Sequence, residues 1–582
     1  MTKTSIFSVS TKHLIAAAVS FPMAYLLVMY FSNGINPIYV LAVTAALTFL
    51  YGKLKGLKTK GRNTVCAAVF SFALSAAIFI GDRLNLKSGV CEPILKRHIL
   101  YLSAIFFAVF PAVFLLLEYI GDDKQFSIML PTGKKKRIYI SLAAAALITG
   151  FYLFAYLCHF PSISTYDSWA VLRQITGEIP YSNWHPIIYT LALRLFTGHS
   201  LWSLQTGAAL FSLCQMLFMA LSAGYTVNWM LKKNLHPAFA GIAALYYAIP
   251  PLFAAFSMTV WKDVPFGAVA VLYMLAVYDL LETKGEMLHS VKGILRFTLL
   301  SYFTGMLRHN GYYVIIVMTI ILLTVYIIKQ KRQCLRIVPF LILPVVLVML
   351  SNSFSLRLGV EEAFSSEAFS IPAQQIARTV VSGGEITPQQ KEELELFFDM
   401  DKLNEYNPFL ADPAKNSIKQ GYFNANKGGF IKLWISLMPK NAGSYVSAYL
   451  LQTHGYWHPG DKSETMLDPS ANAFSNFGIE KHRIIEVDGV NAGAVRPYDF
   501  ISIGLMVWII LFCGVSLIHR KQYMKLAAVL PIIGIWGTIM LATPTDCSFR
   551  YVYALPLALP VIIFITLSGA NEESKSGVKG EG

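Results

Sequence analysis

The sequence predicts an all-α polytopic membrane protein with about fourteen transmembrane helices and an inserted, mainly helical soluble domain. Three observations lead to this prediction. Of the 582 residues, 55% are apolar and only 14% are charged, against roughly 25% charged in an ordinary soluble domain. The mean hydropathy of +0.53 means that much of the surface faces lipid, which excludes a soluble enzyme. Apolar runs long enough to cross about 30 Å of hydrocarbon recur through most of the chain.

The apolar runs fall into three groups along the chain. Residues 1–137 are expected to form an N-terminal addition of four spans, residues 138–352 a transmembrane core, and residues 498–570 the C-terminal transmembrane helices. The expected spans are 13–32, 36–52, 64–80, 99–119, 138–158, 200–223, 238–257, 264–281, 293–307, 309–328, 335–351, 499–518, 524–542 and 551–568. The polar, Gly-rich tail 571–582 is expected to be disordered.

The orientation follows from the basic residues, which collect in short cytoplasmic loops of membrane proteins. With both termini in the cytoplasm, the basic loops near 53–62, 134–137, 232–233, 284–292, 329–336 and 520–525 fall on the cytoplasmic side. The exception is 81–98, whose Arg83, Lys87, Lys96 and Arg97 would be external. This assignment requires that residues 185–198 do not cross the membrane. The run is about fourteen residues long, which suits a juxtamembrane helix within the external loop 159–199.

Residues 353–497 lack apolar runs and are expected to form the extracytoplasmic soluble domain. They hold 17 of the 33 acidic residues and 13 basic ones, so the rest of the chain carries about +19. The overall charge of +15 therefore reflects the cytoplasmic loops rather than a nucleic-acid partner, and we expect no nucleic acid. The expected partner of the apolar surface of the spans is the lipid bilayer.

Four short polar clusters fall on the external side, at the ends of predicted spans. They are YDSW at 166–169 with YSNWHP at 181–186, WKDVP at 261–265, RHNG at 308–311 and TPTDCSFRY at 543–551. Ionisable groups in such positions tend to line a site rather than face lipid. The functional residues are therefore expected among these clusters.

Asp167 and His185 are the candidates in the first external loop. An aspartate there can act as a general base or bind a divalent cation, although Asp is also a common helix N-cap. His185 can donate to a phosphate or move a proton, and the alternative is a histidine in an interfacial Trp/Tyr belt.

The later clusters contribute mainly cations. Lys262 and Asp263 are candidates for the site, or they extend to the surface or pair with each other. Arg308 and Arg550 have guanidinium groups suited to bidentate phosphate binding, and structural pairing with an acidic neighbour is the alternative. The remaining candidates, His309 and Asn310, follow Arg308 directly and form with it a short polar cluster within an apolar stretch.

These residues resemble those of the GT-C class of integral membrane glycosyltransferases, which includes protein O-mannosyltransferases and aminoarabinose transferases. The resemblance covers about 138–568 and is nearest to an uncharacterised bacterial branch of the class. It rests on Tyr166-Asp167-Ser168, Trp184-His185-Pro186, Trp261-Lys262-Asp263-Val264-Pro265, Arg308-His309-Asn310-Gly311 and Phe549-Arg550-Tyr551.

The resemblance implies a reaction on the external face of a bacterial cell membrane, in which a sugar passes from a polyprenyl-phosphate carrier to a cell-envelope glycan, polymer or protein. Asp167 is then the general base or a metal ligand, and Asp263 is a second acidic contributor. The implied substrate-binding residues are His185, Lys262, Arg308, His309, Asn310 and Arg550. Members of the class often have two acidic residues spaced by one in this loop. Here positions 165 and 169 are Thr and Trp, so no cofactor is firmly implied and a divalent cation at Asp167 stays open.

Two other functions compete with glycosyl transfer. In a transporter or flippase for a lipid-linked or anionic envelope precursor, the same charges would line the path of the substrate. That function, however, predicts charged residues near the middle of the spans and two halves of the chain that resemble each other. A non-catalytic assembly factor would dock through residues 353–497. It predicts that the external clusters do not converge in space, so that Asp167 and Arg308, for example, lie on opposite sides of the bundle.

Overall fold

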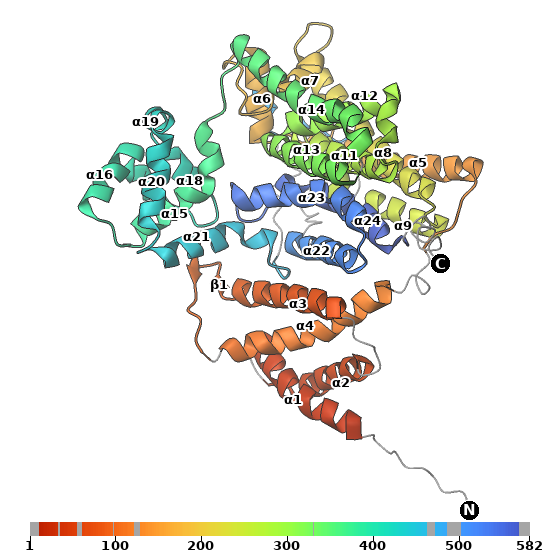
Figure 1. Cartoon of the computed structure of the whole chain (residues 1–582). Helices are drawn as coiled ribbons and strands as arrows, with labels where there is room; N and C mark the ends of the chain where they lie inside the picture. The colour runs from red at the N-terminus through yellow and green to blue at the C-terminus, as the bar shows by residue number, and fades with distance from the viewer. Residues whose placement is uncertain are drawn as a thin grey trace, which may run out of the picture. The chain divides into compact units, whose positions relative to one another are not determined.

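The computed structural model describes residues 11–32, 35–54, 61–96, 98–121, 128–329, 331–461, 472–485 and 502–569. The predicted tail 571–582, parts of the basic loops near 53–62 and 329–336, and residues 462–471 and 486–497 of the predicted soluble domain lie outside these ranges. The described residues are helical almost throughout (Figure 1). Among them, the only sheet is a hairpin that pairs β1 (Leu84–Asn85) with β2 (Val90–Cys91).

The prediction of an all-α polytopic membrane protein is confirmed at this level. Nine helices of the described chain are long and apolar enough to cross a membrane, and one bent helix pair would make ten. The structure does not establish the expected count of fourteen. Part of the difference comes from short helices, because α12, α22 and α24 have 17, 17 and 14 residues, fewer than the eighteen of a straightforward span.

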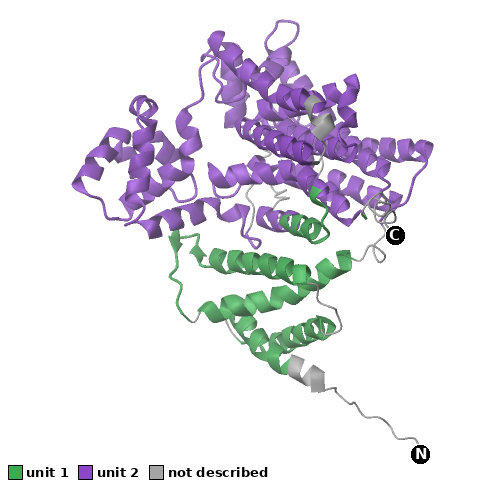
Figure 2. Cartoon of the chain, in the orientation of Figure 1, with its two compact units in different colours: residues 1–127, 511–523, 569–582 green, residues 128–510, 524–568 purple. Residues whose placement is uncertain are grey.

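The chain divides into two compact units (Figure 2). Unit 1 comprises residues 1–127, 511–523 and 569–582, and unit 2 comprises residues 128–510 and 524–568. The main helices of unit 1 are α1 (Thr11–Phe31), α2 (Pro37–Leu54), α3 (Gly61–Gly81) and α4 (His98–Gly121). The buried side chains of Ala24, Phe79 and Ile105 belong to the core that these helices share. The boundary expected at residue 137 falls inside the next helix, because that helix begins within the basic cluster at Lys134.

Unit 2 begins with helices that include the expected transmembrane core. They are α5 (Lys134–Cys158), α6 (Tyr166–Thr176), α7 (Ile187–Thr197), α8 (Leu204–Lys232), α9 (Pro237–Ala248), α10 (Pro251–Met258), α11 (Asp263–Glu282), η1 (Glu286–His289), α12 (Val291–Leu307), α13 (His309–Lys329) and α14 (Lys331–Arg357). Gly224 of α8 allows close packing on α5, since a Cβ there would lie 2.7 Å from that of Ala145. The short α7, at 11 residues, rises only about 16 Å, so it is too short to cross, as the orientation argument requires.

Helix α11 is the centre of unit 2. In its apolar window 89% of the residues are buried, and it packs against α8, α12 and α24. The run predicted as one span at 238–257 is broken into α9 and α10, which are bent by 55°. The break follows from Pro250-Pro251, because a proline lacks the N–H of a continuing helix and restricts the residue before it. After this break, α10 leads the chain toward Lys262.

The segment that follows α14 is a bundle of short helices with a core of its own. The helices are η2 (Ser365–Phe369), α15 (Ser370–Val381), α16 (Pro388–Phe397), α17 (Met400–Leu403), α18 (Asp412–Asn416), α19 (Gln420–Ala425), α20 (Lys427–Leu437), α21 (Ala442–Thr453), η3 (His454–Tyr456) and η4 (Ser475–Phe477). Phe397, Phe398, Phe423 and Phe430 are among its buried residues. The expected start at residue 353 falls in α14, which continues to Arg357. The chain then ends with α22 (Ile503–His519), α23 (Tyr523–Leu541), η5 (Phe549–Val552) and α24 (Ala554–Leu567).

Candidate functional site

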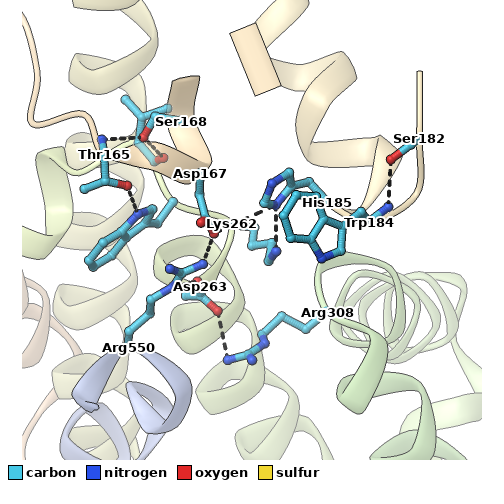
Figure 3. A network of polar contacts seen from close by, with 12 residues as sticks. Thr165, Asp167, Ser168, Ser182, Trp184, His185, Lys262, Asp263, Arg308 and Arg550 are labelled. Carbon is cyan, nitrogen blue, oxygen red and sulfur yellow. Dashed lines mark hydrogen bonds and ion pairs between the residues drawn. The ribbon is translucent and has the colours of Figure 1, made fainter. Parts of the chain in front are cut away.

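The candidate site lies at the N-terminal end of α11, within unit 2. Asp263 is the first residue of this helix and is fully buried, and its two oxygens contact different guanidinium groups (Figure 3). Arg308 Nη1 lies 2.8 Å from Oδ1, and Arg550 Nε donates to Oδ2 at 2.7 Å. Arg308 follows the last residue of α12, and Arg550 lies in η5. Asp263 therefore joins three separate helical elements in one ion-pair network.

Asp167 enters the same network from α6. Arg550 Nη2 donates to Asp167 Oδ2, so one guanidinium is shared by both carboxylates. The start of α6 is held by Ser168 Oγ, which accepts from Thr165 N at 3.0 Å and donates to Val260 O at 2.8 Å. The N-cap position belongs to Thr165, so Asp167 does not cap the helix. Its carboxylate instead faces Arg550.

Lys262 is held differently from the two arginines. Its Nζ lies 2.8 Å from His185 Nδ1, and no carboxylate among the described residues forms an ion pair with it. The alternative that Lys262 pairs with Asp263 is therefore wrong. An ammonium group cannot accept a hydrogen bond, so Lys262 donates and the imidazole accepts at Nδ1. The ring proton of the neutral imidazole then lies on His185 Nε2, which is buried and has no hydrogen-bond partner within the described chain.

Burial and the neighbouring charges set the ionisation of these groups. Burial opposes the charge of Asp167, but Arg550 first, then Lys262 and His185, hold its pKa below the usual range. Burial and the nearby ammonium of Lys262 lower the pKa of His185 to about 3, so the ring is neutral at pH 7. Burial also lowers the pKa of Lys262 to about 8, against the attraction of Asp167 and Asp263. At pH 7 the network holds three cations and two carboxylates.

Two aromatic residues support the arginines, and sequence reasoning did not assign them a role. The guanidinium of Arg550 lies 4.8 Å from the ring centroid of Trp261, whose Nε1 donates to Thr165 Oγ1. Tyr551 lies under both arginines, with ring centroids 5.3 Å from the Arg550 guanidinium and 5.2 Å from that of Arg308. Trp261 and Tyr551 are direct sequence neighbours of Lys262 and Arg550, and this was the signal that could have identified them.

Six of the eight predicted site residues meet in this network, and two lie beside it. His309 Nε2 is 2.8 Å from the carbonyl of Asn183, so it holds the loop that carries His185. Asn310 Nδ2 donates to Thr538 Oγ1 on α23 at 3.0 Å, which is a contact between helices rather than part of the network. The six that meet are Asp167, His185, Lys262, Asp263, Arg308 and Arg550.

The residues present do not fit a divalent cation. The Asp167 and Asp263 carboxylates are occupied by guanidinium groups, which repel a metal ion. Within the described residues, no group of three or more His, Cys, Asp or Glu side chains is arranged to hold a metal. The divalent cation left open at Asp167 therefore finds no second ligand in this network.

The inserted helical segment is tied to the loops of the site by backbone hydrogen bonds. Residues 181–183, just before His185, exchange hydrogen bonds with Glu361 at 2.8 Å in both directions. Ser164, just before α6, accepts from Ala473 N at 3.2 Å. The loop before Arg550 is held in the same way, since Asp546 N donates to Phe409 O at 2.9 Å. The segment therefore positions the loops that carry Asp167, His185 and Arg550.

A family model matches residues 177–483, which is more than half of the chain. The chain belongs to this family, DUF6020. It is described as a family of unknown function. The match to DUF6020 includes His185, Lys262, Asp263 and Arg308 and lies between Asp167 and Arg550. No curated protein and no solved structure matches the chain.

Proposed function

We propose that the chain is a membrane glycosyltransferase that moves a sugar from a polyprenyl-phosphate carrier to a cell-envelope acceptor. The observation that carries this proposal is the unbalanced charge of the network, in which three cations face two carboxylates at the ends of membrane-spanning helices. A lipid phosphate is a charged leaving group that needs fixed cationic donors at this depth. Lys262 is the cation that no carboxylate neutralises among the described residues, and it supports such a ligand.

In the proposed reaction, the guanidinium of Arg550, which contacts both Asp167 and Asp263, also binds the carrier phosphate. A carrier phosphate oxygen that accepts from Arg550 competes with Asp167 for the guanidinium. Asp167 is the more exposed of the two carboxylates, with 23% of its side chain accessible. Once released, it accepts the proton of the acceptor hydroxyl while that oxygen attacks the sugar carbon. The bond between the sugar and the phosphate oxygen breaks, and Lys262 and Arg308 stabilise the charge on the departing carrier phosphate.

The finer topology belongs to the same proposal. The enzyme has a GT-C-like core of about fourteen spans in a bacterial cell membrane, with both termini in the cytoplasm. The site and the inserted segment 353–497 then lie on the extracytoplasmic face, where a cell-envelope acceptor is found. The basic cluster Lys134–Arg137, at the opposite end of α5 from the site, supports this orientation.

One observation favours transport as the second candidate. Discontinuous helices near a charged site are typical of transporters, and α9 and α10 are such a pair, bent by 55° with α10 leading toward Lys262. A transporter or flippase would move a lipid-linked or anionic precursor without breaking its glycosyl bond. The acidic and basic groups of the network lie at helix ends, which favours surface chemistry over a path through the bundle.

The test is Asp167→Asn in the purified full-length protein, reconstituted with radiolabelled polyprenyl-phosphate hexoses and pentoses and a cell-envelope fraction. The wild type is expected to release polyprenyl phosphate and label the acceptor. The variant is expected to lose at least about a hundredfold in rate, because general-base catalysis contributes roughly 10²–10⁴-fold. Asp401→Asn, an exposed carboxylate of α17, is the matched control.

Full activity of a folded Asp167→Asn protein would remove Asp167 from the mechanism. Movement of an intact labelled donor across the bilayer, with no release of polyprenyl phosphate, would support the transporter instead. An assembly factor would do neither. Its prediction that Asp167 and Arg308 lie on opposite sides of the bundle is wrong, since both belong to the network around Asp263.

A further inference from the structure

A second group of basic side chains lies at the same end of the bundle, next to the C-terminal end of α5. Residues 481–485 run alongside this end, where His482 N donates to Phe160 O and Ile484 N donates to Leu157 O, both at 2.9 Å. The rings of Phe160 and His482 lie 4.8 Å apart. Lys481 and Arg483 flank His482, and we call these two residues together with His159 the α5-end cluster.

The α5-end cluster lies where lipid headgroups meet the protein. Helix α5 is a candidate span of 25 residues, so it is about 37 Å long and extends past about 30 Å of hydrocarbon. It exposes the apolar side chains of Leu142, Phe151 and Phe154, as a lipid-facing helix does. Because the helix ends at Cys158, the hydrogen-bonded segment beside it lies at the membrane surface.

Lys481 and Arg483 lie close enough to His159 to affect its ionisation. Burial first, and then the charges of Lys481 and Arg483, lower the pKa of His159 to about 4. The His159 ring is therefore neutral at pH 7, and its Nδ1 has no hydrogen-bond partner within the described chain. Among the described residues 480–485, the two cations outnumber one carboxylate, that of the exposed Glu480, and the nearby Ile484 is 52% exposed. The combination of basic and apolar side chains at this depth matches a phospholipid, whose phosphate lies just above its acyl chains.

We propose that Lys481, Arg483 and His159 bind the phosphate of an anionic membrane lipid, at a position separate from the candidate site. Lys481 and Arg483 contact the phosphate oxygens, and Ile484 contacts the first acyl carbons. The inference does not depend on glycosyl transfer. It has a consequence for the site, because the chain leads from Phe160 through Ser164 to Asp167, and residues 472–485 form hydrogen bonds with both Phe160 and Ser164. Bound lipid therefore stabilises the loop that carries Asp167.

The experiment measures lipid binding to the purified full-length protein in detergent, by native mass spectrometry and by thermal unfolding. Phosphatidylglycerol and phosphatidylcholine with identical acyl chains are the two probes. We expect the wild type to bind phosphatidylglycerol roughly tenfold or more tightly, since each basic residue near the surface favours anionic lipid. The double variant Lys481→Gln/Arg483→Gln is expected to lose this preference while unfolding normally without lipid.

Two further variants make the result specific. Lys391→Gln/Lys432→Gln removes two exposed lysines elsewhere in the inserted segment and is expected to keep the preference. Glu480→Gln removes the exposed acidic neighbour and is expected to strengthen phosphatidylglycerol binding. A preference that survives in Lys481→Gln/Arg483→Gln overturns the proposal. Millimolar inorganic phosphate that displaces the lipid and alone reproduces its stabilisation also overturns it, because the site would then be one for free anions.

Discussion

Helix α11 carries an ion-pair network at each end, and the two differ in charge balance. At its C-terminal end, Asp279 accepts from Arg296 Nη1 at 2.6 Å and from Trp229 Nε1 at 3.0 Å, and Lys233 lies 2.8 Å away. Lys233 also pairs with Glu282. Two cations thus meet two carboxylates. At the N-terminal end, Lys262, Arg308 and Arg550 meet only Asp167 and Asp263.

The comparison separates a structural network from a candidate site. Both ends of α11 combine a tryptophan, cations and a buried or nearly buried aspartate, so residue type alone does not distinguish them. The difference is that the Asp279 network is neutral, whereas the Asp263 network has one cation, Lys262, that forms no ion pair with a carboxylate of the described chain. An unbalanced buried charge costs stability, and a ligand of opposite charge offsets that cost.

The largest expected effect is on stability, from removing the aspartate at each end. Asp263→Ala leaves Arg308 and Arg550 buried without their central partner, which costs about 3–5 kcal/mol. Asp279→Ala is expected to cost less, about 1–2 kcal/mol, because Lys233 and Arg296 are partly exposed and water replaces the carboxylate. Thermal unfolding in detergent measures both. Equal losses would mean that the two networks have the same structural role.

The next effect is on anion binding, from removing one lysine at each end. Lys262→Met is expected to weaken the binding of farnesyl phosphate, a short polyprenyl phosphate, by about tenfold to a hundredfold, since a hydrogen bond to a charged group contributes about 1.5–3 kcal/mol. Lys233→Met is the matched control and is expected to leave the affinity unchanged. Isothermal titration calorimetry measures both. A similar loss of affinity in the two variants would show that the lysines affect binding by stabilising the structure and not by contacting the ligand.

The sequence predicts which residues belong to the candidate site better than it predicts which of them pair, because paired residues can be far apart along the chain. Each candidate ends or begins an apolar run, so a common side of the membrane was predictable for all of them. The particular pairs were not, because Asp167 and Arg550 are 383 residues apart and no local pattern relates them. The same limit explains Asn310, whose partner Thr538 is 228 residues away.

The fold shows a similar division between local and long-range features. Helix positions followed from apolar runs, and the short α7 from its length. The break between α9 and α10 was visible at Pro250-Pro251, yet the run was predicted as one span because hydropathy alone ignores backbone chemistry. The backbone hydrogen bonds from Glu361 and Ala473 to the site loops involve main-chain atoms only, so side-chain patterns carry no signal for them.

A smaller effect is expected from pH, and it applies to one end of α11 only. The pKa of Lys262 is lowered to about 8, so the side chain is charged below pH 8 and neutral above it. The affinity for an anion is therefore expected to fall by a few-fold as pH rises from 7 to 9, because the cation is lost. Lys262→Arg is expected to remove this dependence, since arginine stays protonated. An unchanged pH profile in Lys262→Arg would assign the titration to another group.

The smallest expected effect comes from the indole N–H at each end. Trp261→Phe keeps an aromatic face under Arg550 but loses the hydrogen bond to Thr165, and Trp229→Phe loses the hydrogen bond to Asp279. Each is expected to cost about 1 kcal/mol of stability.

The two tryptophan variants are expected to differ in ligand binding. Trp261→Phe alters the start of α6 and hence the position of Asp167 against Arg550, so the affinity for farnesyl phosphate is expected to change about two- to fivefold, whereas Trp229→Phe leaves it unchanged. If Trp261 acts through Thr165, adding Trp261→Phe to Thr165→Val causes little further change, since Thr165→Val has already removed the hydrogen bond that the indole makes. Additive effects of the two substitutions would instead assign the role of Trp261 to its ring contact with Arg550 alone.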